Sequence, residues 1–400
     1  MDREILSEIK NNLDNDLILL IIGARQVGKT SIIKKIYNEL NINKTFLNLE
    51  DFEYLRLLNE HPENIFKLTK YNSQTKQIIF IDEIQYLNNP TNFLKYIYDE
   101  YKGIIKIVAT GSSSFYIDEK FKDSLVGRKK IFNIFTLNFR EFLNFKDKSD
   151  LLNRDNYSIA ETRLIKELFS EYITYGGYPA VVLENDIENK KEKLMSIAYD
   201  YVKKDVYEAD IKYTEQYYNI LKIIANEVGN LINKSELSKS LKISLSSVEK
   251  CFYVMQKSFH IALIKPYFKN VRKELTKMPK GYFLDLGLRN LFCNNYNNIE
   301  LREDKGMLLE NVVFREMAMQ LKYFDFYLKF WRTQDQNEVD FIINEKQAIE
   351  VKFSKDNFNI KKYSKFIENY PDIKLECIDY DDIIKMSLNK NFFHYTGKTY

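Results

Sequence analysis

The chain has 400 residues and a net charge of only +3, with 45% hydrophobic, 29% charged and 14% aromatic residues. This composition excludes general disorder and, at about 150 residues per domain, predicts a soluble, globular chain of two or three domains. The small net charge excludes nucleic-acid binding through a global positive field, so such binding would need local basic patches.

The N-terminal third alternates short apolar runs with amphipathic stretches. Because the connections between the runs are long enough for helices, we expect a mainly parallel sheet covered by helices. The run at 17–22 is far shorter than the roughly 20 residues of a membrane span, and residues 1–6 lack a signal-peptide pattern, so we expect no membrane role. The runs that read as strands are 17–22, 45–49, 78–81, 104–109 and 131–137.

The middle of the chain reads as helical. A polar stretch at 146–157 interrupts the alternation, and residues 159–209 follow a helical period that is broken at Gly176 and Pro179. This segment predicts a small helical lid. Residues 217–269 predict a helix (218–228), two helices that begin at serines and a strand (262–268), which is the order of a winged helix-turn-helix.

The part of the chain after Pro279 returns to an α/β pattern. Residues 326–332, 338–343 and 348–353 read as strands, with a tight turn expected at 344–346. The predicted fold class is therefore a multi-domain α/β protein. Its expected domains are a parallel α/β domain at 1–145, a helical lid at 146–212, a winged helix at 213–272 and a C-terminal α/β domain at 273–400.

A complete G-x-x-x-x-G-K-[ST] motif stands between the first predicted strand and a helical pattern at 31–40, which is the context of a P-loop. Lys29 should reach the β- and γ-phosphates and Thr30 should place its hydroxyl on Mg²⁺, so ATP and Mg²⁺ are the predicted cofactors. The alternative is a chance glycine turn before a helix. The predicted nucleotide-binding residues are Gly23, Ala24, Arg25, Gln26, Val27, Gly28, Lys29, Thr30 and Ser31.

An apolar strand at 78–81 ends in two adjacent carboxylates, Asp82 and Glu83. A buried strand of this kind delivers Asp82 to the carboxyl edge of the sheet, where it can hold Mg²⁺. Glu83 can then polarise the attacking water as a general base. The alternative is an exposed strand end or a helix cap. Beside the P-loop motif, the pair predicts a Walker B segment and ATP hydrolysis.

Small hydroxyl residues follow the strand at 104–109. Ser112 is the first candidate to sense the γ-phosphate and Thr110 is the second, while a plain helix N-cap is the alternative for either. Arg128 is a candidate to stabilise the transition-state charge, either in cis or across a subunit contact. A solvated arginine is the alternative for Arg128 and also for Arg25. Action across a contact makes a homo-oligomer a candidate assembly.

A series of short motifs runs along the chain: Gly-Ala-Arg-Gln-Val-Gly-Lys-Thr (23–30), Phe-Ile-Asp-Glu-Ile-Gln (80–85), Ala-Thr-Gly-Ser-Ser-Ser (109–114), Val-Gly-Arg (126–128), Phe-Arg-Glu-Phe (139–142), Tyr-Gly-Gly-Tyr-Pro (175–179), Lys-Asp-Val (204–206) and Pro-Lys-Gly-Tyr-Phe-Leu-Asp-Leu-Gly-Leu (279–288). In this order they resemble the large prokaryotic family of AAA+-like predicted ATPases with a C-terminal domain of unknown function. The resemblance covers almost the whole chain. It implies an AAA+-type domain, a winged helix and a C-terminal fold like that of restriction endonucleases. One departure is that Phe139 follows Asn138, where the family more often has proline and a small residue.

Lysines surround the predicted winged helix. A recognition helix that begins near Ser246 could enter a major groove with lysines on the phosphates, which makes DNA the candidate further partner. The alternative is a winged helix used only for packing, because Glu236 and Glu249 dilute the charge. The serines that open its helices are Ser235 and either Ser244 or Ser246, and the lysines are Lys234, Lys239, Lys242 and Lys250.

Charged residues on the C-terminal strands resemble the pattern of PD-(D/E)xK nucleases. Period-two geometry puts Glu350 and Lys352 on one face, and Asp340 lies on the neighbouring strand. Asp340 and Glu350 would bind Mg²⁺, Lys352 would activate water, and Glu310 would complete the site from a helix at 306–321. The alternatives are a degenerate structural copy and surface ion pairs.

Other polar residues support no further site. His61, His260 and His394 are scattered, and Cys251, Cys293 and Cys377 fit neither a disulfide framework nor a zinc site, which favours the cytoplasm. The predicted function is Mg-dependent ATP hydrolysis coupled to a DNA-related action. One alternative is an ATP-regulated, metal-dependent nuclease, and another is a non-hydrolysing ATP switch. No partner protein can be named from the sequence.

Overall fold

A computed structural model describes residues 3–69, 75–111, 125–154, 156–268, 274, 277–321 and 324–390. The chain divides into two compact units. Unit 1 comprises Met1–Phe135, Lys204–Asp210 and Lys257–Phe259, and unit 2 comprises Thr136–Lys203, Ile211–Gln256 and His260–Tyr400. Each unit has its own sheet, and the two are described separately below.

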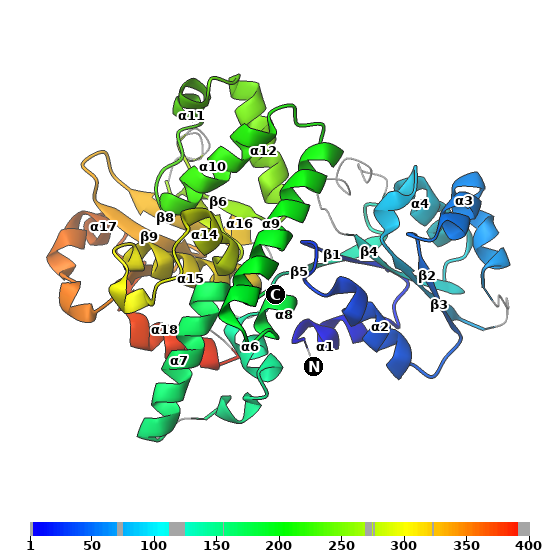
Figure 1. The fold of residues 1–400 in the computed structure, drawn as a ribbon, viewed down its shortest axis with the longest axis horizontal. Helices are drawn as coiled ribbons and strands as arrows, with labels where there is room; N and C mark the ends of the chain where they lie inside the picture. Colours follow the sequence, from blue (N-terminus) through cyan, green and yellow to red (C-terminus); the bar gives the residue numbers. More distant parts are fainter. Residues whose placement is uncertain are drawn as a thin grey trace. The chain divides into compact units, whose positions relative to one another are not determined.

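Unit 1 is built on a parallel sheet in the order β2-β3-β4-β1-β5 (Figure 1). All positions of β1, β3 and β4 are buried, as expected of parallel strands covered on both faces. The strands are β1 (Ile18–Gly23), β2 (Lys44–Asn48), β3 (Gln77–Asp82), β4 (Ile105–Gly111) and β5 (Lys129–Ile134).

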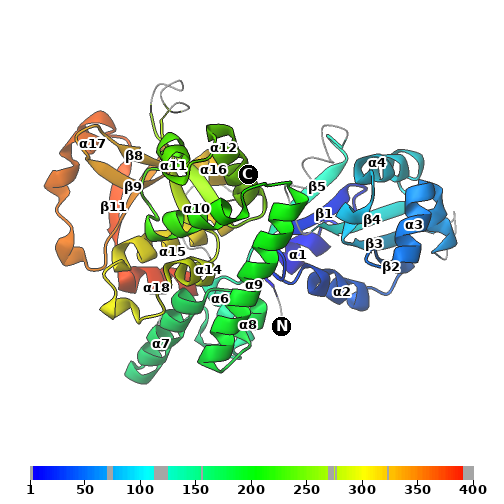
Figure 2. The same ribbon diagram turned by 45° about the horizontal axis from the view of Figure 1, so that its top comes forward.

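Helices cover both faces of this sheet (Figures 1 and 2). The helices α3 (Phe52–Glu60) and α4 (Pro90–Glu100) bury Leu58, Leu94 and Ile97 against alternate residues of the strands. The helices α1 (Ile5–Lys10) and α2 (Lys29–Glu39) lie on the other face. The prediction of a parallel sheet between helices is confirmed, and each strand lies within three residues of its expected bounds at either end.

Unit 2 begins with helices and continues into a mixed sheet in the order β11-β10-β9-β8-β6-β7. Its strands are β6 (Ile261–Pro266), β7 (Lys280–Phe283), β8 (Leu328–Arg332), β9 (Glu338–Ile343), β10 (Gln347–Val351) and β11 (Lys374–Ile378). Its helices are α6 (Phe139–Phe145), α7 (Ile159–Tyr175), α8 (Pro179–Val182), α10 (Thr214–Asn226), α11 (Lys234–Leu241), α12 (Leu245–Lys257), α14 (Leu286–Cys293), α15 (Lys305–Gln320), α16 (Phe324–Tyr327), α17 (Ser364–Asn369) and α18 (Tyr380–Leu388).

The helix α9 (Ile187–Glu208) contributes to both units, because its residues up to Lys203 belong to unit 2 and those from Lys204 belong to unit 1. In unit 2, α15 packs on β7 and β10, while α17 buries Phe366 against Trp331 and Val339. The β6–β8 pairing is parallel and joins residues of the predicted winged helix to the C-terminal strands in one sheet. The expected boundary at 272 therefore falls inside this sheet.

Two of the short motifs meet inside unit 2. The N–H of Gly177 donates to Asp285 Oδ2 at 2.9 Å, and a Cβ at Gly177 would lie 2.2 Å from the carbonyl oxygen of Leu137. The buried guanidinium of Arg315 donates to the carbonyl oxygens of Leu284 at 3.1 Å and Thr136 at 3.1 Å. Only glycine permits so close an approach of two backbones, so these motifs hold the unit together.

No helix in the described part of the chain is long and apolar enough to cross a membrane.

Candidate functional site

The P-loop lies at the carboxyl edge of the unit 1 sheet. β1 ends at Gly23 and α2 begins at Lys29, so the loop between them curls directly into a helix N-terminus. Gln26 and Gly28 have positive φ angles of 60° and 93°. Among the residues that the structure describes, no side chain caps α2. Its first backbone N–H groups are therefore available for an anion, as a phosphate site requires.

Lys29 is buried beside this loop. Its ammonium donates to the carbonyl oxygens of Gly23 at 3.1 Å and Ala24 at 2.7 Å. Burial lowers the pKa of Lys29 to about 8, although the Glu83 carboxylate opposes this shift. The guanidinium of Arg3 donates to the carbonyl oxygens of Val27 at 2.9 Å and Phe135 at 2.7 Å, which ties the loop to the end of β5.

The acidic pair stands at the end of β3, on the same edge. Thr110 on β4 donates its hydroxyl to Asp82 Oδ1, and the N–H of Glu83 donates to Thr110 Oγ1 at 3.0 Å. Glu83 has a left-handed backbone with φ of 58°, and its carboxylate accepts from Gln85. β4 lies between β3 and β1, so Thr110 stands between the acidic pair and the P-loop strand.

Arg25 points to the end of α9. Its guanidinium donates to both carboxylate oxygens of Glu208, at 2.9 and 3.0 Å, and lies 3.6 Å from Asp205. Burial raises the pKa of Asp205 to about 7, against the nearby Arg25 charge, which lowers it. Arg25 is therefore a paired arginine rather than a solvated one. Its partner Glu208 lies 183 residues further along the chain.

The last two predicted catalytic residues of unit 1 are Ser112 and Arg128. Ser112 lies outside the described residues, so its role stays a prediction. The carbonyl oxygen of Arg128 accepts the Ile18 N–H at 2.8 Å, which puts Arg128 at the amino end of β1, and its guanidinium pairs with Asp99 at 2.7 Å. At about 3.3 Å per residue, β1 separates Arg128 from the P-loop by roughly 16 Å. This separation favours action of Arg128 across a subunit contact over action in cis, and the role of Arg128 stays a prediction.

The residues at this edge fit a nucleotide with its magnesium ion. The uncapped N-terminus of α2 and the positive φ of Gly28 suit phosphate groups, and carboxylate and hydroxyl oxygens are hard ligands of the kind that Mg²⁺ takes. Asp82 and Thr30 are the residues of the predicted metal site.

The predicted nuclease residues of unit 2 lie around a lysine. The side chain of Lys280 on β7 has no exposed surface, and its Nζ lies 3.0 Å from Glu310 Oε1, 2.5 Å from Glu338 Oε1 and 3.8 Å from Asp340 Oδ1. Burial lowers the pKa of Lys280, but these carboxylates raise it further, so the net shift is upward. Burial raises the pKa of Glu310 to about 8, although Lys280 opposes that shift. We call Lys280, Glu310, Glu338 and Asp340 the acidic cluster.

The other two predicted nuclease residues pair with each other. Lys352 donates its ammonium to Glu350 Oε1. Burial raises the pKa of Glu350 to about 7, and the nearby Asp340 adds to the shift. In the described part of the chain, no three His, Cys, Asp or Glu residues are grouped so as to hold a metal ion. The arrangement of Glu310, Asp340, Glu350 and Lys352 as one magnesium site stays a prediction. In the structure, the buried ammonium of Lys280 lies among the carboxylates of Glu310, Glu338 and Asp340.

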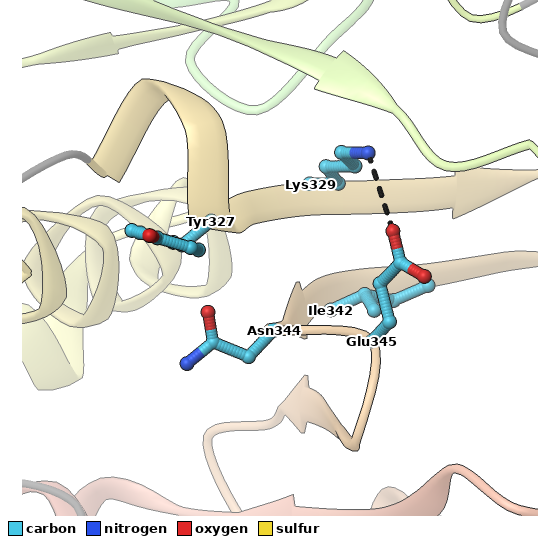
Figure 3. Close-up of a pocket in the computed structure, with 5 residues that line it drawn as sticks. All are labelled: Tyr327, Lys329, Ile342, Asn344 and Glu345. Carbon is cyan, nitrogen blue, oxygen red and sulfur yellow. Dashed lines mark ion pairs between the residues drawn. The ribbon is translucent and has the colours of Figure 1, made fainter. Parts of the chain in front are cut away.

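A small pocket of about 170 Å³ opens elsewhere in unit 2, between the start of β8 and the β9–β10 turn, and is lined by Tyr327, Lys329, Ile342, Asn344 and Glu345 (Figure 3). The Lys329 ammonium lies 3.7 Å from Glu345 and 2.9 Å from Glu274. Because this cation is already balanced by two carboxylates, the pocket offers no free charge for an anion.

Several residues that contact the candidate sites are not identified from the sequence. Arg3, Asp205, Glu208 and Lys280 lie far along the chain from the groups that they contact. Asp205 and Lys280 stand inside the motifs at 204–206 and 279–288, which were the signal that could have found them. Nothing in the local pattern distinguishes Arg3 or Glu208 from a surface charge.

Comparisons with known proteins match three parts of the chain. Residues 15–143 match a family model described as an AAA domain. Residues 166–298 and 305–394 match models of domains of unknown function, DUF8612 and DUF4143.

Similar proteins extend along most of the chain. An uncharacterized protein of Methanocaldococcus jannaschii, MJ1544, is 27% identical over 388 residues, which cover 94% of this chain and 85% of that protein. An uncharacterized protein of Haemophilus influenzae is 27% identical over 379 residues, with 90% and 87% coverage. The structure of the Walker-type ATPase PABY2304 of Pyrococcus abyssi is 15% identical with a TM-score of 0.49, and the likeness covers 73% of this chain and 95% of that one.

The AAA domain match, together with the P-loop at the carboxyl edge of the unit 1 sheet, supports an ATP-binding ATPase of the AAA type. The descriptions of the other two segments carry no function. The winged-helix and nuclease-like interpretations of those segments stay predictions.

Proposed function

We propose that this chain hydrolyses Mg-ATP in unit 1 and couples the reaction to an action on DNA. The observation that carries the proposal is the shared edge of one sheet: the P-loop follows β1, and the Asp82–Glu83 pair ends β3, linked to Thr110 on the strand between them. Parallel strands deliver their carboxyl ends to one edge, where ligands of such sheets bind.

Each group at this edge has a role in the proposed reaction. The backbone N–H groups at the start of α2 hold phosphate oxygens, and Lys29 leaves the carbonyl oxygens of Gly23 and Ala24 to reach the β- and γ-phosphates. Thr30 and Asp82 would hold the magnesium ion. That ion, when bound, neutralises charge on the phosphates.

Glu83 orients and deprotonates the attacking water in this scheme. Its backbone N–H is fixed by Thr110 and its carboxylate accepts from Gln85, so the side chain is held at the edge of the sheet. Ser112 is the proposed γ-phosphate sensor. Arg128 would act on a neighbouring subunit of a homo-oligomer, since it is remote from its own P-loop.

The DNA part of the proposal is supported by the order α10, α11, α12, β6 and β7. β6 pairs with β7 in antiparallel fashion, and Leu231, which precedes α11, forms a bridge with Lys280. Helices followed by such a hairpin are typical of a winged helix. Lys239, Lys242 and Lys250 are exposed there and suit phosphate contacts.

The proposal predicts ATP turnover that depends on Glu83 and Lys29. Glu83→Gln should lower kcat by about 100-fold or more with ATP affinity retained, because it removes the general base alone. Lys29→Ala should weaken ATP binding, since it removes the cation at the phosphates. Steady-state ATPase assays and ATP titrations, with and without duplex DNA, measure these effects, and stimulation of the wild type by DNA is expected.

Glu100→Gln provides a matched control, because Glu100 is an exposed glutamate at the end of α4 in the same unit. It should behave as the wild type. A wild-type chain that binds ATP without turnover under any of these conditions would leave an ATP switch as the better function. Turnover that DNA does not change would remove the DNA part alone.

A further inference from the structure

The acidic cluster of unit 2 raises the question of which cation it holds. A divalent ion in proteins needs about six oxygen ligands at roughly 2.0–2.6 Å, depending on the ion. Here the oxygens of Glu310, Glu338 and Asp340 surround the Nζ of Lys280 at 3.0, 2.5 and 3.8 Å. These are ion-pair distances around an ammonium, and a second cation could enter only if Lys280 left.

The carboxylates of the cluster are also engaged by other donors. Glu310 Oε1 accepts the Tyr282 hydroxyl at 2.5 Å, and Asp340 Oδ2 accepts the Val351 N–H at 2.8 Å. Glu338 Oε2 accepts from Arg332 at 2.7 Å. Each carboxylate therefore has at least two donors that compete with a metal ion for its oxygens.

The surroundings of Lys280 close the cluster further. Its ammonium lies 5.4 Å from the centre of the Phe330 ring, and a Cβ at Gly229 would lie 2.8 Å from the Glu310 oxygens. A buried ammonium is stable only where opposite charge and hydrogen bonds replace its water. The cluster supplies both opposite charge and hydrogen bonds, so the buried position of the Lys280 ammonium is stable.

We propose that Lys280 is the resident cation of the acidic cluster, in the place where the sequence pattern predicts a divalent metal, and that unit 2 therefore works without metal-dependent phosphodiester cleavage. The lysine comes from β7, whereas Glu310 comes from α15, and Glu338 and Asp340 come from β9. The ion pairs thus join three elements that are remote in the sequence. The cluster is a cross-link within the unit rather than a catalytic metal centre.

Replacement of Lys280 tests this assignment in the nucleotide-free, full-length chain. Lys280→Met keeps the length of the side chain but leaves the carboxylates without their cation, so the thermal midpoint should fall by roughly 10 °C. Added Mn²⁺ should restore part of this loss, because the variant has an open cation site. Lys265→Met is the matched control, since Lys265 is exposed on the paired strand β6. Equal midpoints for the two variants would overturn the proposal.

A second measurement decides the question even if Lys280→Met does not fold. Mn²⁺ is titrated into the nucleotide-free wild type, Asp340→Asn and Glu350→Gln by calorimetry, and plasmid integrity is followed with Mn²⁺ present. The proposal requires the same Mn²⁺ binding in all three proteins and no cleavage that depends on Asp340 or Glu350. Wild-type Mn²⁺ binding or DNA cleavage that either substitution removes would contradict it. Neither experiment involves the P-loop, so failure here would leave the proposed ATP hydrolysis untouched.

Discussion

At the edge of the unit 1 sheet, one side chain can fix the positions of two others that are proposed to bind metal or activate water. Thr110 donates to Asp82 and accepts from the Glu83 backbone, so one hydroxyl holds both members of the acidic pair. Sequence reasoning placed Thr110 second to Ser112 as a phosphate sensor. The geometry favours a different role, in which Thr110 positions the two carboxylates.

Thr110→Val should therefore slow turnover without removing a group that contacts ATP. The substitution keeps the shape of the side chain but loses both hydrogen bonds, and displacement of the carboxylates should lower kcat by about 10- to 100-fold. KM for ATP should change little. Steady-state kinetics measure both constants, and Thr110→Ser should recover most of kcat because it restores the hydroxyl. Loss of activity in Thr110→Ser equal to that in Thr110→Val would contradict the positioning role.

A buried histidine in unit 2 predicts a loss of stability in acid. His260 is fully buried beside Tyr217, whose hydroxyl lies 3.1 Å from Nδ1, and burial lowers the pKa of His260 to about 4. The unfolded chain takes up the proton near the ordinary pKa, about 6.5, whereas the folded chain does not until about 4. His260 thus stabilises the fold above pH 6.5, and this contribution falls by up to about 1.4 kcal/mol per pH unit between pH 6.5 and 4.

Urea denaturation of the wild type and His260→Gln between pH 7.5 and 4.5 measures this effect. The free energy of unfolding should fall more steeply in the wild type than in the variant as the pH is lowered. His61→Gln is the control, because His61 is an exposed histidine in unit 1. Parallel curves for the wild type and His260→Gln would show that His260 does not carry the acid sensitivity.

Secondary-structure elements were largely predictable where the pattern is local. β9 has the same bounds as its predicted strand at 338–343, and α15 differs by one residue at each end from the helix at 306–321. Buried apolar runs and helical periods reveal such elements because they depend on nearby residues. The parallel pairing of β6 with β8 was not predicted, since register between distant strands leaves no local signal.

The candidate sites follow the same rule. The P-loop and the acidic pair are contiguous motifs, and both lie at the edge of the sheet where their sequence contexts place them. The nuclease-like residues were read from strands that do form, yet their chemistry depends on Lys280 from a hairpin strand more than 50 residues before β9. A pattern of carboxylates predicts a cation site but does not say which cation fills it.

At the scale of the whole molecule, nucleotide should protect the two units unequally. A ligand that binds only the native state stabilises it by about 2.7 kcal/mol at 100 times its Kd. All the predicted nucleotide contacts lie in unit 1. With Mg-ATP bound to the Glu83→Gln chain, amide hydrogen exchange should slow by up to about 100-fold in β1 and β3 and change little in β8 to β10.

Mass spectrometry of peptides from the two sheets, with Lys29→Ala as the control, measures this difference. The control should show no protection in either unit, because it binds nucleotide weakly. Equal protection of both sheets in Glu83→Gln would show that the units share one unfolding transition.

The discontinuity of unit 1 limits how this protein could be divided or recombined. A fragment that ends at Phe135 would keep every P-loop residue but lose Asp205 and Glu208, so Arg25 would face solvent beside the phosphates without its counter-ions. Exchange of ATPase segments between such proteins by a single crossover would separate Arg25 from the α9 carboxylates matched to it. The end of α9 must therefore be inherited together with the P-loop, so the ATPase unit is a poor module for gene shuffling. Substitutions at Arg25 are expected to occur together with substitutions at Asp205 or Glu208.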